Sequence, residues 1–135
     1  MKIIHCADLH LDSKMTANLD KDKAKERKAE LLVTFENMIT FAKKQKVEAI
    51  LIAGDLFDTN LVSETAVYTV RQIITDNPQI TFYYLKGNHD SLGIFHESED
   101  IPDNLKLFRD SWTYYEIPFE AFILRHGFCR VSGSA

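Results

Sequence analysis

Three short apolar runs occur along the chain, at residues 2–7, 47–53 and 80–85. Apolar and polar side chains do not alternate regularly in them, which is typical of strands covered on both faces of a sheet. The third run is also rich in β-branched and aromatic residues, which favour extended backbone. These three segments are therefore predicted to form the strands of a buried sheet.

Two helical patterns separate these runs. The longer one, at residues 22–46, has a stripe of apolar residues at three- and four-residue spacings that would face a core: Leu31, Leu32, Phe35, Met38, Ile39 and Ala42. The shorter one begins after Ser63, a good N-cap residue, and ends near Asn77, just before a proline. The resulting order β-α-β-α-β predicts an α/β fold with a parallel sheet and helical crossovers.

Beyond Asp90 the pattern is weaker. Residues 91–104 are predicted to be mostly loop, and residues 112–117 and 121–124 to be two shorter strands. The remaining residues to Ala135 are mainly small and polar. No repeat, low-complexity tract or domain boundary interrupts the chain, so one domain is expected.

Composition narrows the protein class. The chain has 135 residues, of which 45% are apolar and 27% charged, as in soluble globular proteins. No apolar run approaches the roughly 20 residues that span a bilayer, and no signal peptide precedes the first strand. Two distant cysteines, Cys6 and Cys129, form no disulfide framework, so we expect a cytoplasmic protein without membrane contact. The net charge of −4 argues against a uniformly basic DNA-binding domain.

Metal-binding side chains follow each predicted strand. Asp8 and His10 come after the first, Asp55 after the second and Asn88 after the third. Because the carboxyl ends of parallel strands meet at one edge of a sheet, we expect these four residues to meet there. Carboxylate and imidazole suit Mn²⁺, Fe²⁺ or Zn²⁺, whereas the harder amide oxygen of Asn88 favours Mn²⁺ or Mg²⁺. Two such ions, about 3.5–4 Å apart, could clamp a phosphate and activate a water.

His89 and Asp90 are predicted to be catalytic. The Asp90 carboxylate could orient the His89 ring and favour its protonated form. A protonated His89 could then donate a proton to a leaving oxygen or stabilise developing charge.

In order and spacing, the Asp-Leu-His, Gly-Asp-Leu-Phe-Asp and Gly-Asn-His-Asp motifs resemble those of the calcineurin-like metallophosphoesterases. The opening Ile-His-Cys-Ala-Asp-Leu-His-Leu is most similar to the SbcD-type DNA-repair exonuclease branch. The resemblance implies a sandwich of two sheets flanked by helices, and two divalent ions, with Mn²⁺ favoured. Matched residue by residue, it makes Asp8, His10, Asp55 and Asn88 metal ligands, and it places His89 near the leaving group.

The resemblance also implies DNA as substrate, an ATPase partner of the SbcC type and a homodimer. Other members of the family act on nucleotides or phosphoproteins, and that activity is the alternative. A third hypothesis is a non-catalytic fragment that pairs with another copy through a sheet edge.

The chain departs from the family pattern in two places. SbcD-type proteins often have glycine where this chain has Asp12. The family also completes its site with later histidines, including a Gly-His-x-His motif that residues 1–135 do not contain. We therefore expect these residues to be the N-terminal portion of a metallophosphoesterase (nuclease) domain, incomplete at the C-terminus, with a weak second metal site and weak activity.

Several nearby residues have more ordinary interpretations. Asp58 either orients a metal ligand or caps the following turn. Asp12 is expected to be a solvated loop carboxylate, and Cys6 a small buried residue rather than a ligand. The basic residues between Lys21 and Lys28 alternate with acidic ones, which is typical of a solvated helix face, although contact with DNA phosphates is the alternative.

Overall fold

The structure is a computed structural model that describes residues 1–14, 20–58, 62–87, 90, 95, 101–108, 111–117 and 124–128. Its elements, in chain order, are β1 (Ile3–Cys6), α1 (Lys21–Gln45), β2 (Ala49–Ala53), α2 (Glu64–Thr75), β3 (Thr81–Leu85), β4 (Leu105–Phe108), β5 (Thr113–Ile117) and β6 (Leu124–Phe128). No helix in these ranges is long and apolar enough to cross a membrane.

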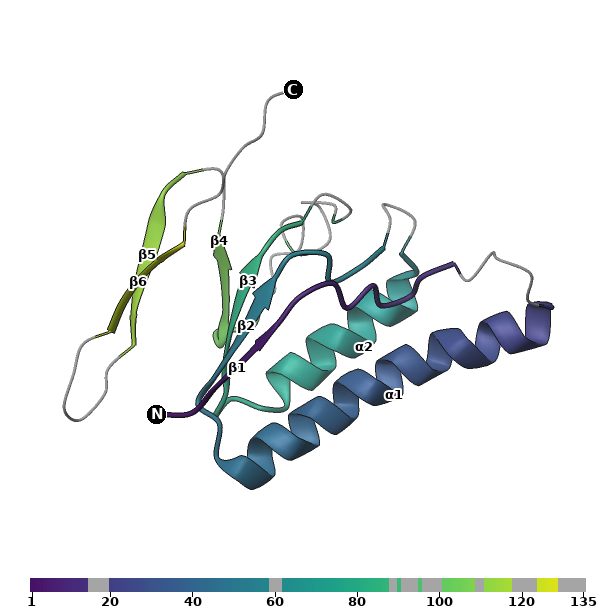
Figure 1. Ribbon diagram of the computed structural model, residues 1–135, viewed down its shortest axis with the longest axis horizontal. Helices are drawn as coiled ribbons and strands as arrows, with labels where there is room; N and C mark the ends of the chain where they lie inside the picture. Colours follow the sequence, from purple (N-terminus) through teal and green to yellow (C-terminus); the bar gives the residue numbers. More distant parts are fainter. Residues whose placement is uncertain are drawn as a thin grey trace.

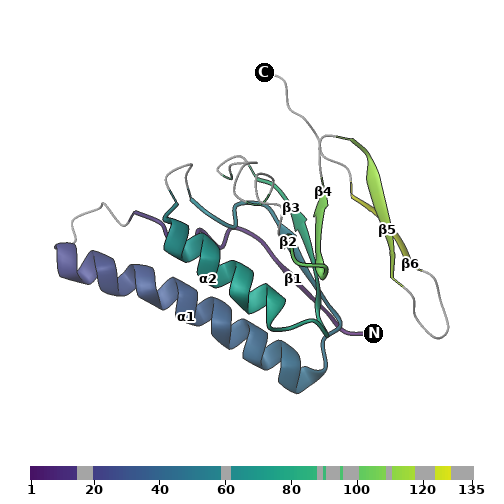
Figure 2. The same cartoon turned by 180° about the vertical axis from the view of Figure 1, so that it is seen from behind.

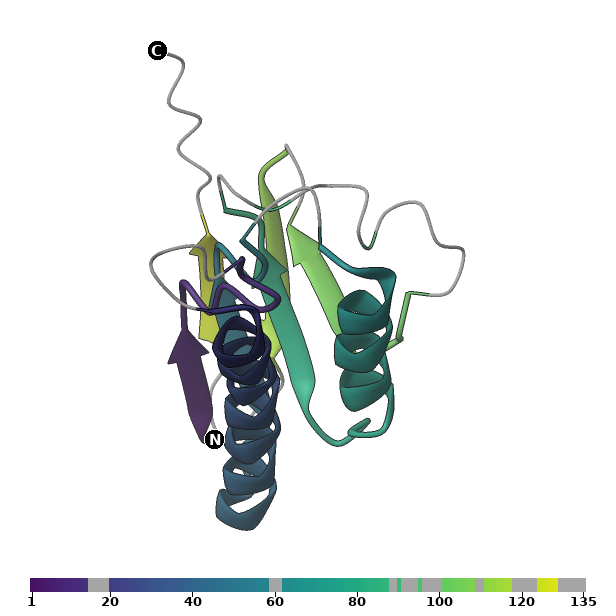
Figure 3. The ribbon, with the colours of Figure 1, turned by 90° about the vertical axis from the view of Figure 1, so that its right-hand side faces the viewer.

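Strands β1 to β4 form a parallel sheet in sequence order, with β1 and β4 at its ends. Helices α1 and α2 cover one face of this sheet, and the antiparallel pair β5–β6 lies on the other side (Figures 1, 2 and 3). The predicted α/β fold with a parallel sheet is confirmed. All four sheet strands end at the same edge, so the loops that follow them begin there.

Capping residues set the helix ends where the sequence placed them. The Asp20 side chain accepts a hydrogen bond from the Lys23 amide at the start of α1, and Ser63 does the same for Ala66 at the start of α2. Lys46 ends α1 in a left-handed conformation, and its amide donates to the carbonyls of Ala42 and Lys43. Both predicted helices are therefore confirmed to within about two residues, the usual uncertainty of helix ends.

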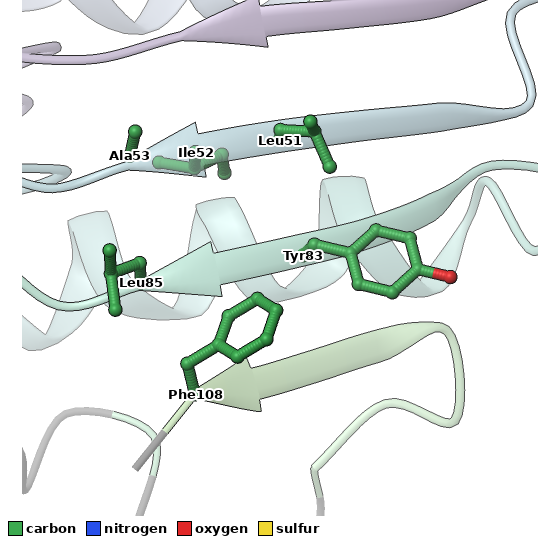
Figure 4. Close-up of a pocket in the computed structure, with 6 residues that line it drawn as sticks. All are labelled: Leu51, Ile52, Ala53, Tyr83, Leu85 and Phe108. Carbon is green, nitrogen blue, oxygen red and sulfur yellow. The ribbon is translucent and has the colours of Figure 1, made fainter. Parts of the chain in front are cut away.

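The main core lies between the helices and the sheet. Phe35, Ile39 and Ala42 of α1 are buried, as the predicted stripe requires, and they pack with buried residues of β2 and β3. A smaller cluster occupies the opposite face of the sheet. There a small apolar pocket is lined by residues of β2, β3 and β4 (Figure 4): Leu51, Ile52, Ala53, Tyr83, Leu85 and Phe108.

Tyr115 of β5 joins the two sheets. Its ring packs edge-on against Tyr83 and Phe108, with centroids 5.5 and 5.1 Å away. Its hydroxyl donates to the Leu107 carbonyl at 3.0 Å. Tyr115 thus links the antiparallel pair to the apolar face of the parallel sheet and fills part of that face.

The structure differs from the predicted strands in three places. Strand β1 is not covered on both faces: Ile3 and His5, on one face, are exposed, whereas Ile4 and Cys6, on the other, are half-buried. Strand β4 lies in a segment with no predicted element, because four residues interrupted by Lys106 give too short a pattern. Of the last predicted strand, residues 121–123 lie outside the described residues, and the described strand Leu124–Phe128 continues beyond the predicted end at residue 124 because it pairs with β5.

Candidate metal centre

Two loops run side by side at the carboxyl edge of the sheet. We call residues 7–14 the β1 loop and residues 54–58 the β2 loop. The amides of Asp8, His10 and Leu11 donate to the carbonyls of the β2 loop residues 54, 55 and 56, at 3.2, 3.0 and 2.9 Å. This parallel pairing extends the β1–β2 register past the ends of the strands. It places the first two predicted metal-binding motifs next to each other.

The backbone of both loops is strained where the ligands lie. Asp8, His10, Asp12 and Asp55 all have positive φ angles, of 53°, 45°, 63° and 47°. Such a conformation costs an L-residue about 1–2 kcal/mol, and it persists where surrounding contacts over-determine it. Strained backbone of this kind concentrates at functional sites, so four instances within two adjoining loops mark this edge of the sheet as the candidate site.

Asp8, His10 and Asp55 converge. Each offers one ligand atom, and these atoms all lie within 4.8 Å of one another. Asp8 is exposed, whereas His10 and Asp55 are half-buried, so the group is open to solvent on one side. Two carboxylates and one imidazole form a donor set that suits Mn²⁺, Fe²⁺ or Zn²⁺. The spacing and chemistry of these residues therefore fit a divalent metal ion.

Asp58 holds the imidazole of His10. Its Oδ1 lies 2.9 Å from His10 Nδ1, and its Oδ2 accepts a hydrogen bond from the Ser13 hydroxyl at 2.8 Å. A carboxylate on one ring nitrogen fixes the ring and orients the other nitrogen, Nε2, towards a metal. Of the two roles considered for Asp58, the contact with His10 favours that of orienting a ligand.

Asp90 is buried, with 3% of its surface exposed. Its Oδ1 accepts from the Phe57 amide at 2.8 Å, and its Oδ2 accepts from the amides of Leu56 at 3.2 Å and Gly87 at 2.9 Å. One carboxylate thus ties the β2 loop to the turn after β3. Asn88 and His89 lie outside the described residues, so their predicted roles, and the orienting of His89 by Asp90, stay predictions.

Tyr84 packs against the same carboxylate from β3. Burial raises the pKa of its phenol far above the ordinary value, and the charge of Asp90, a hydrogen bond to Asp90 and the charge of Asp55 act in the same direction. The hydroxyl therefore stays protonated.

Two glycines allow the loops to approach. Gly54 has a φ of 92°, and a Cβ there would lie 3.2 Å from the Gly87 Cα. A Cβ on Gly87 would overlap the amide nitrogen and Oδ1 of Asp55. The side chain of Asp55 can occupy its position because residue 87 has none. Sequence reasoning had assigned no role to either glycine, although a glycine directly before Asp55 and another directly before Asn88 were the available signal.

The expectation for Asp12 was wrong. Asp12 is buried rather than solvated, with 8% of its surface exposed. Its Oδ2 accepts from the Ser63 amide at 2.7 Å, and its Oδ1 lies 2.6 Å from Lys28 Nζ. Both partners are distant in sequence, so a local pattern gave no sign of them.

Cys6 packs against the main core. It is half-buried, its Sγ is 3.5 Å from the Leu51 carbonyl, and burial raises its pKa to about 11. A thiol that stays protonated at neutral pH is a poor metal ligand. The site thus depends on oxygen and nitrogen donors.

A family model for calcineurin-like phosphoesterases matches residues 1–133. The chain belongs to this family. Among curated relatives, the SbcD subunit of nuclease SbcCD from Escherichia coli K12 is 31% identical over 103 residues, which are 75% of this chain and 24% of that protein. The corresponding SbcD subunit of Staphylococcus saprophyticus is 34% identical over 95 residues, 67% of this chain and 23% of that protein.

A second kind of relative is the uncharacterised metallophosphoesterase YhaO of Bacillus subtilis 168. It is 30% identical over 131 residues, 94% of this chain and 31% of that protein. The chain therefore spans about a quarter to a third of the length of these curated relatives. The family consists of metal-dependent hydrolases, which agrees with the ligand set at the sheet edge.

Proposed function

We propose that this chain carries the first metal-binding half of a phosphodiesterase site that cleaves DNA. The observation that supports it best is the convergence of Asp8, His10 and Asp55 from two adjoining loops onto one point. The similarity to the SbcD subunit of nuclease SbcCD supports DNA as the substrate. The proposal includes that residues 1–135 are the N-terminal portion of a larger nuclease domain.

Asp8, His10, Asp55 and Asn88 would hold two divalent ions, with Mn²⁺ favoured by the mixture of carboxylate, imidazole and amide donors. When bound, the ions would supply Lewis acidity at a phosphate and lower the pKa of water. The chain's own residues do the rest. Asp58 fixes the imidazole of His10, Asp90 ties the β2 loop to the turn after β3 through backbone amides, and His89 donates a proton to the leaving oxygen.

The proposal also covers the partner, the oligomeric state and the cellular compartment of the enzyme. Relatives that are SbcD subunits of nuclease SbcCD support a partner of the SbcC type. The proposal includes that this partner is an ATPase and that the nuclease chain forms a homodimer that acts in DNA repair. The free thiol of Cys6 agrees with a reducing cytoplasm.

A second candidate is a phosphoesterase of the same family with a small substrate, such as a nucleotide, or a phosphoprotein. The match to YhaO is compatible with it, because that relative is a metallophosphoesterase whose name specifies no DNA substrate, and the match covers 94% of this chain. The third hypothesis, self-association of a non-catalytic fragment, is supported by the position of β1 at an end of the described sheet.

The test combines metal binding with turnover. Titration of the chain with Mn²⁺ should show binding that Asp55→Asn weakens and that the control Asp103→Asn, at an exposed carboxylate, does not. Mn²⁺-dependent cleavage of single-stranded DNA and of bis(p-nitrophenyl) phosphate should be abolished by EDTA and reduced by Asp55→Asn and His89→Ala.

The outcomes separate the hypotheses. Full activity in both variants would refute the site assignment. Turnover of the small ester without competition by DNA would favour the second candidate. A wild-type chain that binds no Mn²⁺ and elutes as a dimer would favour the third.

A further inference from the structure

Asp12 joins three segments that are far apart in the sequence. It lies in the β1 loop, contacts Lys28 on α1 and accepts a hydrogen bond from Ser63 at the start of α2. We propose that Asp12, paired with Lys28, is a positioning residue that holds the β1 loop in the conformation in which Asp8 and His10 reach a metal ion. This inference rests on the metal site proposed above.

The first support is the completeness of the Asp12 contacts. Its side chain is 4% exposed, and both oxygens have a partner, the Ser63 amide at 2.7 Å and the Lys28 ammonium at 2.6 Å. A buried carboxylate is tolerated when it is paired and hydrogen-bonded, and removal of one partner leaves an uncompensated charge. Moving Asp12 out of this position would separate a buried charge from its partners, and that loss of free energy favours the observed conformation of the loop.

The second support is the backbone. Asp12 has a φ of 63°, a left-handed conformation that aspartate adopts more readily than most residues and that glycine adopts without cost. His10 and Asp8 are left-handed as well. A loop with three such residues needs contacts outside itself to fix it, and Asp12 supplies them from both helices.

The third support is a chain of contacts from Asp12 to the ligand. The adjacent residue, Ser13, donates its amide to the His10 carbonyl at 3.2 Å and its hydroxyl to Asp58 at 2.8 Å. Asp58 in turn contacts His10 Nδ1. A shift of the backbone at residue 12 would move Ser13, and with it both of the contacts that place the His10 imidazole.

The experiment measures Mn²⁺ affinity by calorimetry alongside unfolding of the metal-free chain. Asp12→Asn keeps an oxygen for the Ser63 amide but removes the charge that faces Lys28. Lys28→Met removes the positive charge that faces Asp12, and Lys28→Arg keeps it. The matched control is Arg27→Met, because Arg27 is on the same helix but pairs with Glu30 on the surface, at 2.7 Å.

We expect Asp12→Asn and Lys28→Met to weaken Mn²⁺ binding by about 10-fold, the lower end of what loss of a supporting contact costs a metal site. Lys28→Arg and Arg27→Met should bind as the wild type does. Glycine adopts the left-handed backbone of residue 12 without strain, but Asp12→Gly removes both side-chain contacts. It should therefore weaken Mn²⁺ binding at least as much as Asp12→Asn does. A merely structural role would lower unfolding stability in these variants without changing the metal affinity of the folded chain.

Folded Asp12→Asn and Lys28→Met variants with wild-type Mn²⁺ affinity would overturn the inference while leaving the proposed function intact. A wild-type chain that binds no Mn²⁺ would overturn both. Since Lys28 is not a candidate ligand, weaker binding in Lys28→Met that Lys28→Arg reverses would support positioning and exclude direct coordination as the explanation.

Discussion

Replacement of Asp90 by asparagine tests how the loops of the site are held together. The wild-type carboxylate accepts hydrogen bonds from the amides of Phe57, Leu56 and Gly87. Asparagine has nearly the same shape but only one acceptor oxygen. Whichever carboxylate oxygen the NH₂ group of asparagine replaces, this group faces at least one backbone N–H. At least one buried backbone amide is then left without an acceptor.

The magnitude follows from these contacts. In the least costly orientation the oxygen stays with Leu56 and Gly87, and the hydrogen bond from Phe57 is lost. A hydrogen bond to a charged group contributes about 1.5–3 kcal/mol, and an unsatisfied buried donor adds to its loss. We therefore expect Asp90→Asn to lower the free energy of unfolding by about 2–4 kcal/mol, a large share of the roughly 5–15 kcal/mol typical of a domain.

Urea unfolding of the metal-free chain, followed by circular dichroism, measures this loss. The control is Asp103→Asn, because Asp103 is exposed and such a change shifts stability by within about 0.5 kcal/mol. A loss below about 1 kcal/mol for Asp90→Asn, with an unchanged slope against urea, would show that the three amides find other partners. The role assigned to this carboxylate would then be wrong.

Two further predictions follow from the packing of the site and of β1. Gly87→Ala should weaken Mn²⁺ binding by at least about 10-fold in a calorimetric titration, because its Cβ overlaps Asp55, and unchanged affinity would contradict the close approach of the loops. In a Cys129→Ser background, a thiol-reactive reagent should label Cys6 at pH 8 much more slowly in the folded chain than in urea. The reason is that a pKa raised from 9.0 to about 11 leaves roughly 100-fold less of the reactive thiolate. The folded-state rate should rise as the pH approaches 11, and equal rates in the two states would contradict the burial of Cys6.

Local pattern was sufficient for the secondary structure around the site. The apolar runs gave β1, β2 and β3, and Ser63 gave the start of α2, because strand burial and helix capping depend on neighbouring residues. Pattern was not sufficient for β4, whose four residues become a strand by pairing with β3. It also misjudged β1, since the burial of each face of a strand depends on what the fold packs against that face.

For the site, sequence placed the metal-binding side chains at strand ends, and the parallel topology brought Asp8, His10 and Asp55 together. What surrounds them was decided by tertiary contacts. The Asp12 carboxylate meets the Ser63 amide across 51 residues, and Asp90 reaches the Leu56 amide across 34. No periodicity encodes such pairs, because the fold brings each buried carboxylate to the donors that compensate its charge.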